Sequence, residues 1–153
     1  MLLDIYLQCW QEKGLISRIL YTKPIANFSL GVVIMLRGVR GATTVTANQC
    51  EEIFERVAEL LAAIVRENAM NTEDIGAVIF SSTPDLNAAF PAAGARKLGW
   101  TQVPLFGTQE IECPEALPLC IRVLILWNTD TCQQDIKHIY LHDAMVLRQD
   151  ITA

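Results

Sequence analysis

The sequence predicts an α+β domain in which helices pack on one side of a mixed β-sheet. Between residues 31 and 148, apolar patterns follow the order strand, helix, strand, helix and then three strands, with a possible short strand at 145–148. With 153 residues, 52% hydrophobic and 19% charged, the chain fits one compact domain and is too apolar for a disordered one.

The first two elements carry the clearest patterns. β-forming apolar residues around 32–36 lead into a glycine-containing stretch up to Val45, which predicts a strand with a kink. Asn48 followed by Glu51 fits an N-cap with an acid in the first turn. Apolar residues then recur at helical spacing, so a long amphipathic helix is expected to end near Asn71.

Shorter patterns fill the second half of the chain. A proline at position 91 and a glycine at position 99 bracket a short helix. A turn is expected at 82–85 in the segment Ser-Thr-Pro-Asp. The remaining strands are expected at 76–81, 103–109, 119–127 and 136–141.

Composition excludes several classes of protein. The net charge of -5 disfavours a nucleic-acid partner, which needs a basic face. The longest apolar run, residues 30–36, is far shorter than a membrane span. Five cysteines, an odd set with no C-x-x-C pair, indicate neither a disulfide framework nor a zinc finger. Together with an N-terminus that lacks a secretory pattern, these features predict a cytoplasmic protein.

The first 34 residues differ from the rest. They carry a net charge of +1, whereas the following residues carry -6, and they show no sustained helical or alternating pattern. We therefore expect residues 1–34 to be an N-terminal extension that is disordered or not native, and residues 35–153 to form the folded domain.

Arg122 is the most informative single residue. It lies within an otherwise apolar strand, on the face that alternation assigns to Cys120, Leu124 and Leu126. A guanidinium in such a place needs a neutralising partner, because burying an unpaired charge is costly. The partner is either an acid of this chain, Glu110 or Glu112, or an anionic ligand, and the pattern alone leaves both open.

Other polar residues are weaker candidates. Arg37 and Arg40 flank Gly38, where a fork of donors could meet a carboxylate, although surface arginines in loops are common. Arg96 and Arg148 are single cations whose simplest role is a solvated surface charge. Glu110 could accept from a substrate hydroxyl or pair with an arginine.

Two histidines lie near the C-terminus of the chain. His138, Tyr140 and His142 would share one face of a continuing strand, and Tyr140 could then serve a polar pocket or a structural role. With no third ligand spaced nearby, a zinc site is disfavoured. The sequence also lacks glycine-rich nucleotide motifs and any pairing of a nucleophile with a base.

Several motifs together resemble the monofunctional AroH-type chorismate mutases. They are the segments Arg-Gly-Val-Arg-Gly-Ala-Thr-Thr-Val at 37–45, Ser-Thr-Pro-Asp-Leu at 82–86, Ala-Phe-Pro-Ala at 89–92, Cys-Ile-Arg-Val at 120–123 and His-Ile-Tyr-Leu at 138–141. The resemblance covers residues 35 to about 150, in order and without large gaps, including Trp-Asn-Thr-Asp at 127–130 and Val-Leu-Arg at 146–148.

The resemblance implies a trimeric pseudo-α/β-barrel with active sites between subunits. It implies the Claisen rearrangement of chorismate to prephenate in phenylalanine and tyrosine biosynthesis, without cofactor or metal. Such a unimolecular reaction needs an enforced geometry and stabilised charge rather than an acid or base. The surplus of apolar residues fits a homotrimer, and converging arginines fit a dicarboxylate.

The resemblance also assigns roles to individual residues. Arg122 is set against the ether oxygen, Glu110 takes the ring hydroxyl, and Arg40 and Tyr140 hold a carboxylate. The remaining substrate-binding residues are two apolar walls, two cations at the mouth and a short backbone stretch, namely Phe90, Leu147, Arg96, Arg148, Gly107 and Thr108. The sequence departs from the family at Ala93, where a lysine is frequent, and at Gly107, where a cysteine or small polar residue is frequent; contacts there are lost or replaced by backbone.

Two other functions are alternatives to a chorismate mutase. A YjgF-like trimeric enamine deaminase also lines an intersubunit cleft with an arginine, but its signature motifs are not visible in this sequence. A non-catalytic trimeric sensor of aromatic-pathway acids would be favoured by loss of Arg122 or Glu110, and both residues are present.

Overall fold

The structure of the chain, a computed structural model, describes residues 35–149. The expected N-terminal extension, residues 1–34, lies outside the described residues and stays a prediction. Within residues 35–149, no helix is long and apolar enough to cross a membrane.

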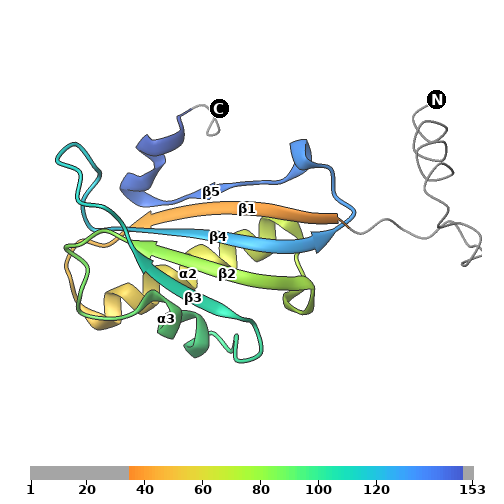
Figure 1. The fold of residues 1–153 in the computed structure, drawn as a ribbon, viewed down its shortest axis with the longest axis horizontal. Coiled ribbons are helices and arrows are strands. Elements are labelled where there is room, and N and C mark those ends of the chain that lie inside the picture. The colour runs from red at the N-terminus through yellow and green to blue at the C-terminus, as the bar shows by residue number, and fades with distance from the viewer. Residues whose placement is uncertain (1–34, 150–153) are drawn as a thin grey trace, which may run out of the picture. The chain divides into compact units, whose positions relative to one another are not determined.

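Five strands form one mixed sheet in the order β3-β2-β4-β1-β5 (Figure 1). β4 is antiparallel to both β1 and β2, whereas β3 runs parallel to β2 and β5 parallel to β1. The mixed sheet predicted from the sequence is therefore confirmed. The strands are β1 (Met35–Thr44), β2 (Ile75–Ser82), β3 (Leu105–Gln109), β4 (Cys120–Thr129) and β5 (Ile139–Tyr140).

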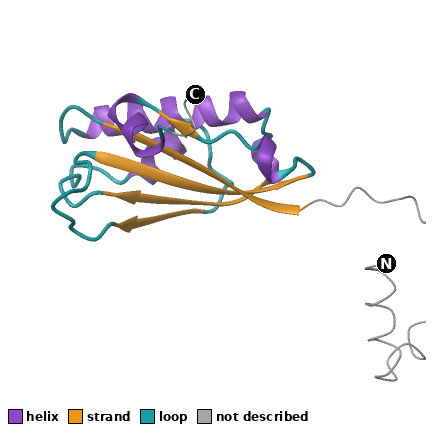
Figure 2. Cartoon of the chain, turned by 90° about the horizontal axis from the view of Figure 1, so that it is seen from above, coloured by secondary structure: helices purple, strands orange, loops and turns teal. Residues whose placement is uncertain are grey.

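Two α-helices, α2 (Cys50–Asn68) and α3 (Pro91–Lys97), pack on one side of the sheet (Figure 2). Helix α2 buries an apolar stripe at helical spacing, composed of Ile53, Val57, Leu60, Leu61, Ala63 and Ile64. These side chains and the inward residues of β1, β2 and β4 form the main hydrophobic core. The expectation that the helices lie on one side of the sheet is confirmed.

The start of α2 differs from the sequence prediction. The residue at the N-cap position is Gln49, and its side chain makes no capping hydrogen bond. Asn48 is engaged elsewhere, because its Oδ1 accepts hydrogen bonds from the backbone N–H groups of Asn87 and Ala88 at 3.2 and 2.9 Å. The predicted N-cap at Asn48 is therefore wrong. The helix also ends at Asn68 rather than near Asn71.

The segment after β4 also departs from the prediction. The last predicted strand at 136–141 shrinks to Ile139–Tyr140, and the possible strand at 145–148 is instead part of the 3-10 helix η4 (His142–Arg148). His142 has a left-handed backbone with φ of 53°, which turns the chain out of the strand direction. Two further 3-10 turns, η2 (Thr72–Asp74) and η3 (Gln133–Asp135), precede β2 and β5.

Alternation along β1 and β4 gives the sheet two different faces. On the helix-covered face, Val39 and Ile121 are fully buried. Gly41 lies on the same face, where an added Cβ would stand 2.8 Å from Ile64 Cδ1 and 3.1 Å from the Ile139 carbonyl oxygen. The glycine therefore permits the close approach of α2 to β1. The opposite face, which we call the open face, presents Arg40 and Arg122.

Candidate active site

Arg122 lies at the centre of the open face. In the sheet register it stands opposite Ala42 of β1 and Ser81 of β2. Its guanidinium forms an ion pair with Glu110, which follows directly after β3. Ser81 Oγ donates a hydrogen bond of 2.6 Å to the other carboxylate oxygen of Glu110. Of the two acids that the sequence proposed as partners, Glu110 is the one that neutralises Arg122.

A cavity of about 360 Å³ opens around Arg122, and we call it the basic cavity. Three arginines and one tyrosine lie on its walls, together with apolar side chains from β2, β4 and η4. Such a lining suits a small, partly apolar anion better than a neutral or cationic ligand. The cavity is lined by Arg40, Gly41, Ala42, Ile79, Ser81, Arg122, Val123, Leu124, Tyr140, Leu147 and Arg148.

The backbone of Arg40 is hydrogen-bonded to the side chain of His138. The backbone N–H of Arg40 donates a hydrogen bond of 3.1 Å to Nδ1 of His138, which requires this nitrogen to be unprotonated. Partial burial lowers the pKa of His138, and the nearby charges of Arg40 and Arg148 lower it further. His138 is therefore a neutral hydrogen-bond acceptor at the edge of the basic cavity.

The expected common face of the two histidines and Tyr140 is wrong. The strand ends at Tyr140, and the left-handed turn at His142 directs its ring toward helix α2. Tyr140 lines the basic cavity, while His142 contacts Arg56 and Glu59 of α2. Within residues 35–149, no group of three or more His, Cys, Asp or Glu side chains is placed to hold a metal ion.

A second cavity of about 740 Å³ lies between β3, the loop before α3 and α3 itself, and we call it the α3 cavity. Phe90, Arg96, Gly107 and Thr108 line it, and so does Ala93. The Phe90 side chain is 81% exposed, which is unusual for a large apolar residue beside a cavity. At Gly107 an added Cβ would meet no atom within 4 Å, so the wall is open there.

The two cavities lie on opposite sides of β2. Ile79 and Ser81 line the basic cavity, whereas Phe80 and Ser82 line the α3 cavity, and consecutive residues of a strand point to opposite faces. Within one chain the residues predicted for the site are thus divided into two groups. The first is Arg40, Glu110, Arg122, Tyr140, Leu147 and Arg148; the second is Phe90, Arg96, Gly107 and Thr108.

Arg37, the weaker candidate beside Arg40, lies outside both cavities. Its Nε donates a hydrogen bond of 3.2 Å to the carbonyl oxygen of Thr131, so it ties β1 to the loop after β4. Ser81 is not among the residues predicted for the site, although alternation along β2 places it on the same face as Ile79, opposite Arg122.

Cys120 lies beside the site without the properties of a nucleophile. It is fully buried, and burial raises the pKa of its thiol to about 11. Its backbone N–H donates a hydrogen bond of 3.0 Å to Thr83 Oγ1, which fixes the Ser-Thr-Pro-Asp turn against the start of β4. The role of Cys120 is structural.

A family model and two curated proteins that match this chain all belong to the chorismate mutases. The model of the family "Chorismate mutase type I" matches residues 36–151. The curated protein Chorismate mutase AroH of Thermus thermophilus is 46% identical over 118 residues, which are 76% of this chain and 97% of that protein. Chorismate mutase AroH of Bacillus subtilis (strain 168) is 43% identical over 120 residues, which are 78% of this chain and 94% of that protein.

A solved structure agrees with these matches. The chorismate mutase from Clostridium thermocellum superposes with a TM-score of 0.70 at 45% sequence identity, and the match covers 71% of this chain and 97% of that one. The family match spans most of the chain and includes both groups of site residues. The chain therefore belongs to the chorismate mutase type I family.

Proposed function

We propose that the basic cavity of one subunit and the α3 cavity of a neighbouring subunit together form the active site in which this chorismate mutase converts chorismate to prephenate. The observation that carries the proposal is Arg122, a cation inside an apolar strand, fixed by Glu110 within a cavity that holds two further arginines. Chorismate is a dicarboxylate, so its charges match this cavity.

Arg122 is the residue that we assign to the ether oxygen of chorismate. In the rearrangement the C–O bond to this oxygen breaks while a new C–C bond forms, and negative charge grows on the oxygen. The Glu110 carboxylate and the flanking strand hold the guanidinium in place before substrate arrives. A preorganised donor of this kind stabilises the transition state more than the ground state.

The other residues of the basic cavity position the substrate. Glu110 accepts a hydrogen bond from the ring hydroxyl of the substrate, while its Oε1 keeps the hydrogen bond from Ser81 Oγ. Arg40 and Tyr140 hold one carboxylate, while Leu147 supplies an apolar wall and Arg148 a cation at the mouth. These contacts enforce the compact chair-like geometry in which the two reacting carbons meet.

The residues of the α3 cavity complete the site from the adjacent subunit. Phe90 supplies an apolar cover, Arg96 attracts the dianion, and the open wall at Gly107 and Thr108 offers backbone groups in place of a side chain. Support for this arrangement comes from the separation of the two cavities by β2, which keeps them apart within one chain.

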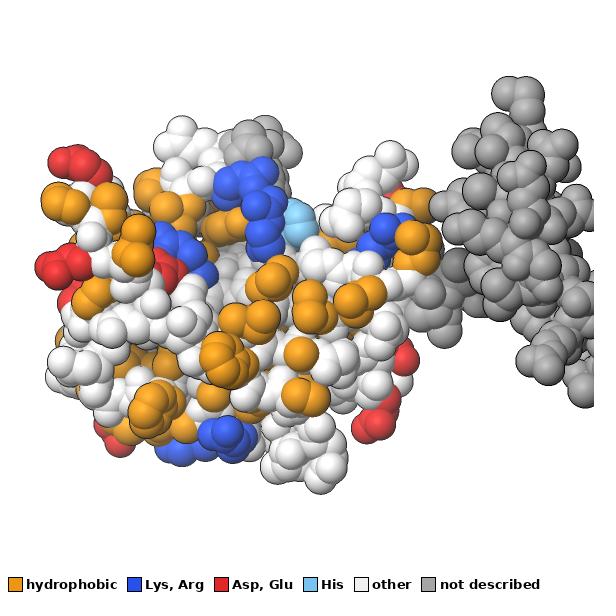
Figure 3. Space-filling view, in the orientation of Figure 1, with side chains coloured by type: hydrophobic (Ala, Val, Ile, Leu, Met, Phe, Trp, Pro, Cys, Tyr) orange, Lys and Arg blue, Asp and Glu red, His pale blue; other side chains and the backbone are white. Residues whose placement is uncertain are grey.

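We propose that the subunits assemble as a homotrimer through the open face. Figure 3 shows apolar side chains gathered over the strands of this face, beside basic ones. On this face the sheet register places Leu36 of β1 and Phe106 of β3, which are 59% and 64% exposed. Exposed apolar area of this kind indicates a contact with another chain, and cyclic assembly would bring unlike surfaces together around a closed ring. Residues 35–153 form the catalytic domain of this assembly.

The test combines activity with mixing of subunits. Loss of chorismate absorbance with formation of prephenate is expected for the purified chain. Arg122→Ala and Arg96→Glu should each be nearly inactive alone, because one loses the ether-oxygen donor and the other repels the dianion. Trimers assembled from both variants should regain activity, since some sites then combine an intact basic cavity with an intact α3 cavity.

The mixing experiment separates a shared site from a site within one chain. Light scattering should give the mass of a trimer for each variant and for the mixture. Activity of the mixture equal to the sum of the two separate variants would contradict a shared site, and an active monomer would contradict the trimer.

A further inference from the structure

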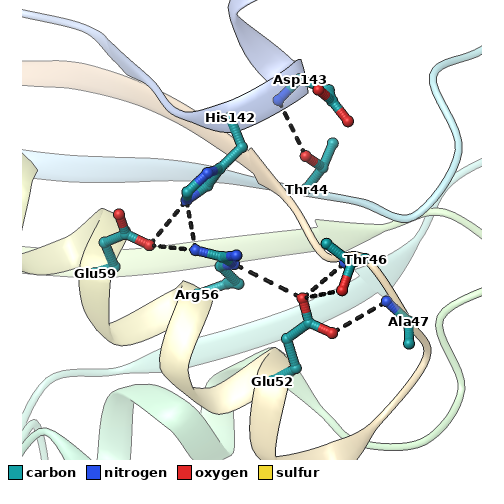
Figure 4. A network of polar contacts seen from close by, with 8 residues as sticks. All are labelled: Thr44, Thr46, Ala47, Glu52, Arg56, Glu59, His142 and Asp143. Atoms are coloured by element: carbon teal, nitrogen blue, oxygen red, sulfur yellow. Dashed lines mark hydrogen bonds and ion pairs between the residues drawn. The ribbon is translucent and has the colours of Figure 1, made fainter.

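A polar network joins the C-terminal segment to helix α2 (Figure 4). At its centre, Nε2 of His142 lies 2.8 Å from Arg56 Nη1 and 2.9 Å from Glu59 Oε2. Arg56 and Glu59 also pair directly at 3.0 Å. The three side chains therefore form a closed triangle, which we call the His142 clamp.

Glu52 connects the clamp to the segment that precedes helix α2. Glu52, one turn before Arg56, accepts hydrogen bonds from the Thr46 N–H at 2.7 Å and from the Ala47 N–H at 3.0 Å. Its Oε1 also lies 3.8 Å from Arg56 Nε. Arg56 thus lies between two carboxylates of its own helix, Glu52 and Glu59. Its side chain therefore loses little conformational entropy when it contacts His142.

His142 occupies the junction between β5 and η4. The chain turns there with a φ of 53°, and the helix that follows carries Leu147 and Arg148 into the wall of the basic cavity. Helix α2 packs on the other face of the sheet, beneath β1. The clamp therefore reaches around the β5 edge and ties the cavity wall to the hydrophobic side of the domain.

Hydrogen bonds on both sides of His142 attach the backbone to β1, but neither of them connects the turn to helix α2. The Leu141 N–H donates to the Ala42 carbonyl oxygen at 2.9 Å, and the Asp143 N–H donates to Thr44 Oγ1 at 3.2 Å. Both bonds go to β1 and flank His142. The side chain of His142 is what connects this point to a second element, α2.

We propose that His142 is a positioning residue of this enzyme, and that its clamp to Arg56 and Glu59 sets the place of Leu147 and Arg148 at the substrate-binding wall. The inference deepens the proposed function and rests on it. Arg122 and Glu110 stand on β4 and after β3 and are held by each other and by Ser81, so we expect the reacting centre to keep its geometry when the clamp is opened.

His142 has a partner in either tautomer of its ring. With the proton on Nδ1, its Nε2 accepts a hydrogen bond from Arg56, and with the proton on Nε2 it donates one to Glu59. The hydrogen bond with His142 also lowers the pKa of Glu59, so the acceptor remains a carboxylate near neutral pH. A glutamine in place of the histidine can likewise accept through its oxygen and donate through its nitrogen.

The experiment measures kcat and KM for chorismate in the full chain. His142→Ala should raise KM about tenfold, as expected for a lost charge-assisted hydrogen bond, and should leave kcat within about twofold. His142→Gln should recover most of the lost affinity. Glu59→Gln should raise KM by a smaller factor, and less so in a chain that already carries His142→Ala, because both changes open the same clamp.

A control variant and a second measurement distinguish a role in positioning from a general loss of stability. Glu67→Gln alters two more exposed ion pairs at the C-terminal end of the same helix, with Arg66 at 3.0 Å and with Lys137 at 3.8 Å, and should leave both constants unchanged. Hydrogen exchange at the amides of residues 143–148 should be faster in His142→Ala than in the wild type. This second readout does not depend on turnover.

The possible results decide between the two proposals. A wild-type chain without chorismate turnover overturns the proposed function, and this inference with it. An active wild type with an unchanged KM in His142→Ala overturns the clamp alone. If His142→Ala does not fold, His142→Gln and Glu59→Gln decide, and wild-type exchange at 143–148 together with wild-type KM in Glu59→Gln overturns the clamp. The clamp is also overturned if His142→Ala and His142→Gln lower kcat and raise KM to the same extent as each other.

Discussion

The two faces of the sheet show how one strand can serve folding and chemistry at the same time. In β4, Ile121 and Ile125 are fully buried against the helices, while Arg122 between them turns to the open face and remains partly exposed. In β2, Phe80 is fully buried and Ser81 donates a hydrogen bond to the Glu110 carboxylate. Neighbouring residues thus have separate tasks, and alternation alone separates them.

The comparison has a direct consequence for mutations. A change on the helix-covered face removes or crowds apolar contacts, so it should alter the free energy of unfolding. A change on the open face touches charged groups at a cavity, so it should alter turnover with little effect on stability. Two substitutions a few residues apart should therefore give opposite signatures.

The largest expected effect is on Arg122. Arg122→Lys keeps the charge but loses the fork of donors that meets both Glu110 and the proposed ether oxygen, so kcat should fall by on the order of 10² to 10³. The Tm should stay within a few degrees of the wild type, because Arg122 is outside the main core. Steady-state kinetics and thermal unfolding check this pair of outcomes. A variant with wild-type kcat would refute the assigned role.

The second expected effect is on Gly41, in the strand β1 that also carries Arg40. Gly41→Ala would place a Cβ 2.8 Å from Ile64 Cδ1 and 3.1 Å from the Ile139 carbonyl oxygen. Overpacking of this kind should destabilise the chain by about 1–3 kcal/mol in urea unfolding. The crowded atoms include a backbone oxygen, so simple rotation of a side chain cannot relieve the strain.

Gly107 supplies the matched control. An added Cβ there meets no atom within 4 Å, so Gly107→Ala should leave unfolding within about 0.5 kcal/mol of the wild type while affecting the α3 cavity. Equal loss of stability in the two variants would mean that the close approach of α2 to β1 does not explain Gly41.

Much of the fold could be predicted because its long elements have strong local patterns. Helix α2 repeats apolar residues at helical spacing, while β1 begins among β-forming apolar residues and β4 is a nearly continuous apolar run. The end of the chain could not be predicted in the same way. Residues 145–148 are apolar enough for a strand, but the positive φ at His142 and the burial of Ala144 against Ala42 and Cys120 favour a 3-10 helix.

The sequence pointed to many of the residues that line the two cavities, but it did not indicate how the cavities are arranged. The motifs around Arg40, Arg122 and Glu110 identify the family, and the lone arginine in an apolar strand calls for an anionic partner. The division into two cavities depends on which side of β2 each residue faces, so it required the structure. The His142 clamp joins residues that are 86 apart in sequence, and no local pattern marks such a contact.

The smallest expected effect concerns His138, at the edge of the open face. Burial, followed by the charges of Arg40 and Arg148, lowers the pKa of His138 below its ordinary value of about 6.5. The unfolded chain therefore binds this proton more readily than the folded one, and protonation favours unfolding. The contribution of His138 to stability is fully present above about pH 6.5 and is lost as the pH falls from there through the folded-state pKa.

His138→Asn should make the stability less sensitive to acid. The asparagine oxygen can accept from the Arg40 N–H as His138 Nδ1 does, but it does not titrate in this range. Between pH 7.5 and pH 5, the Tm of the wild type should therefore fall further than the Tm of the variant, while at pH 7.5 the two should be similar. Parallel Tm profiles would show that the folded and unfolded chains bind the proton of His138 equally.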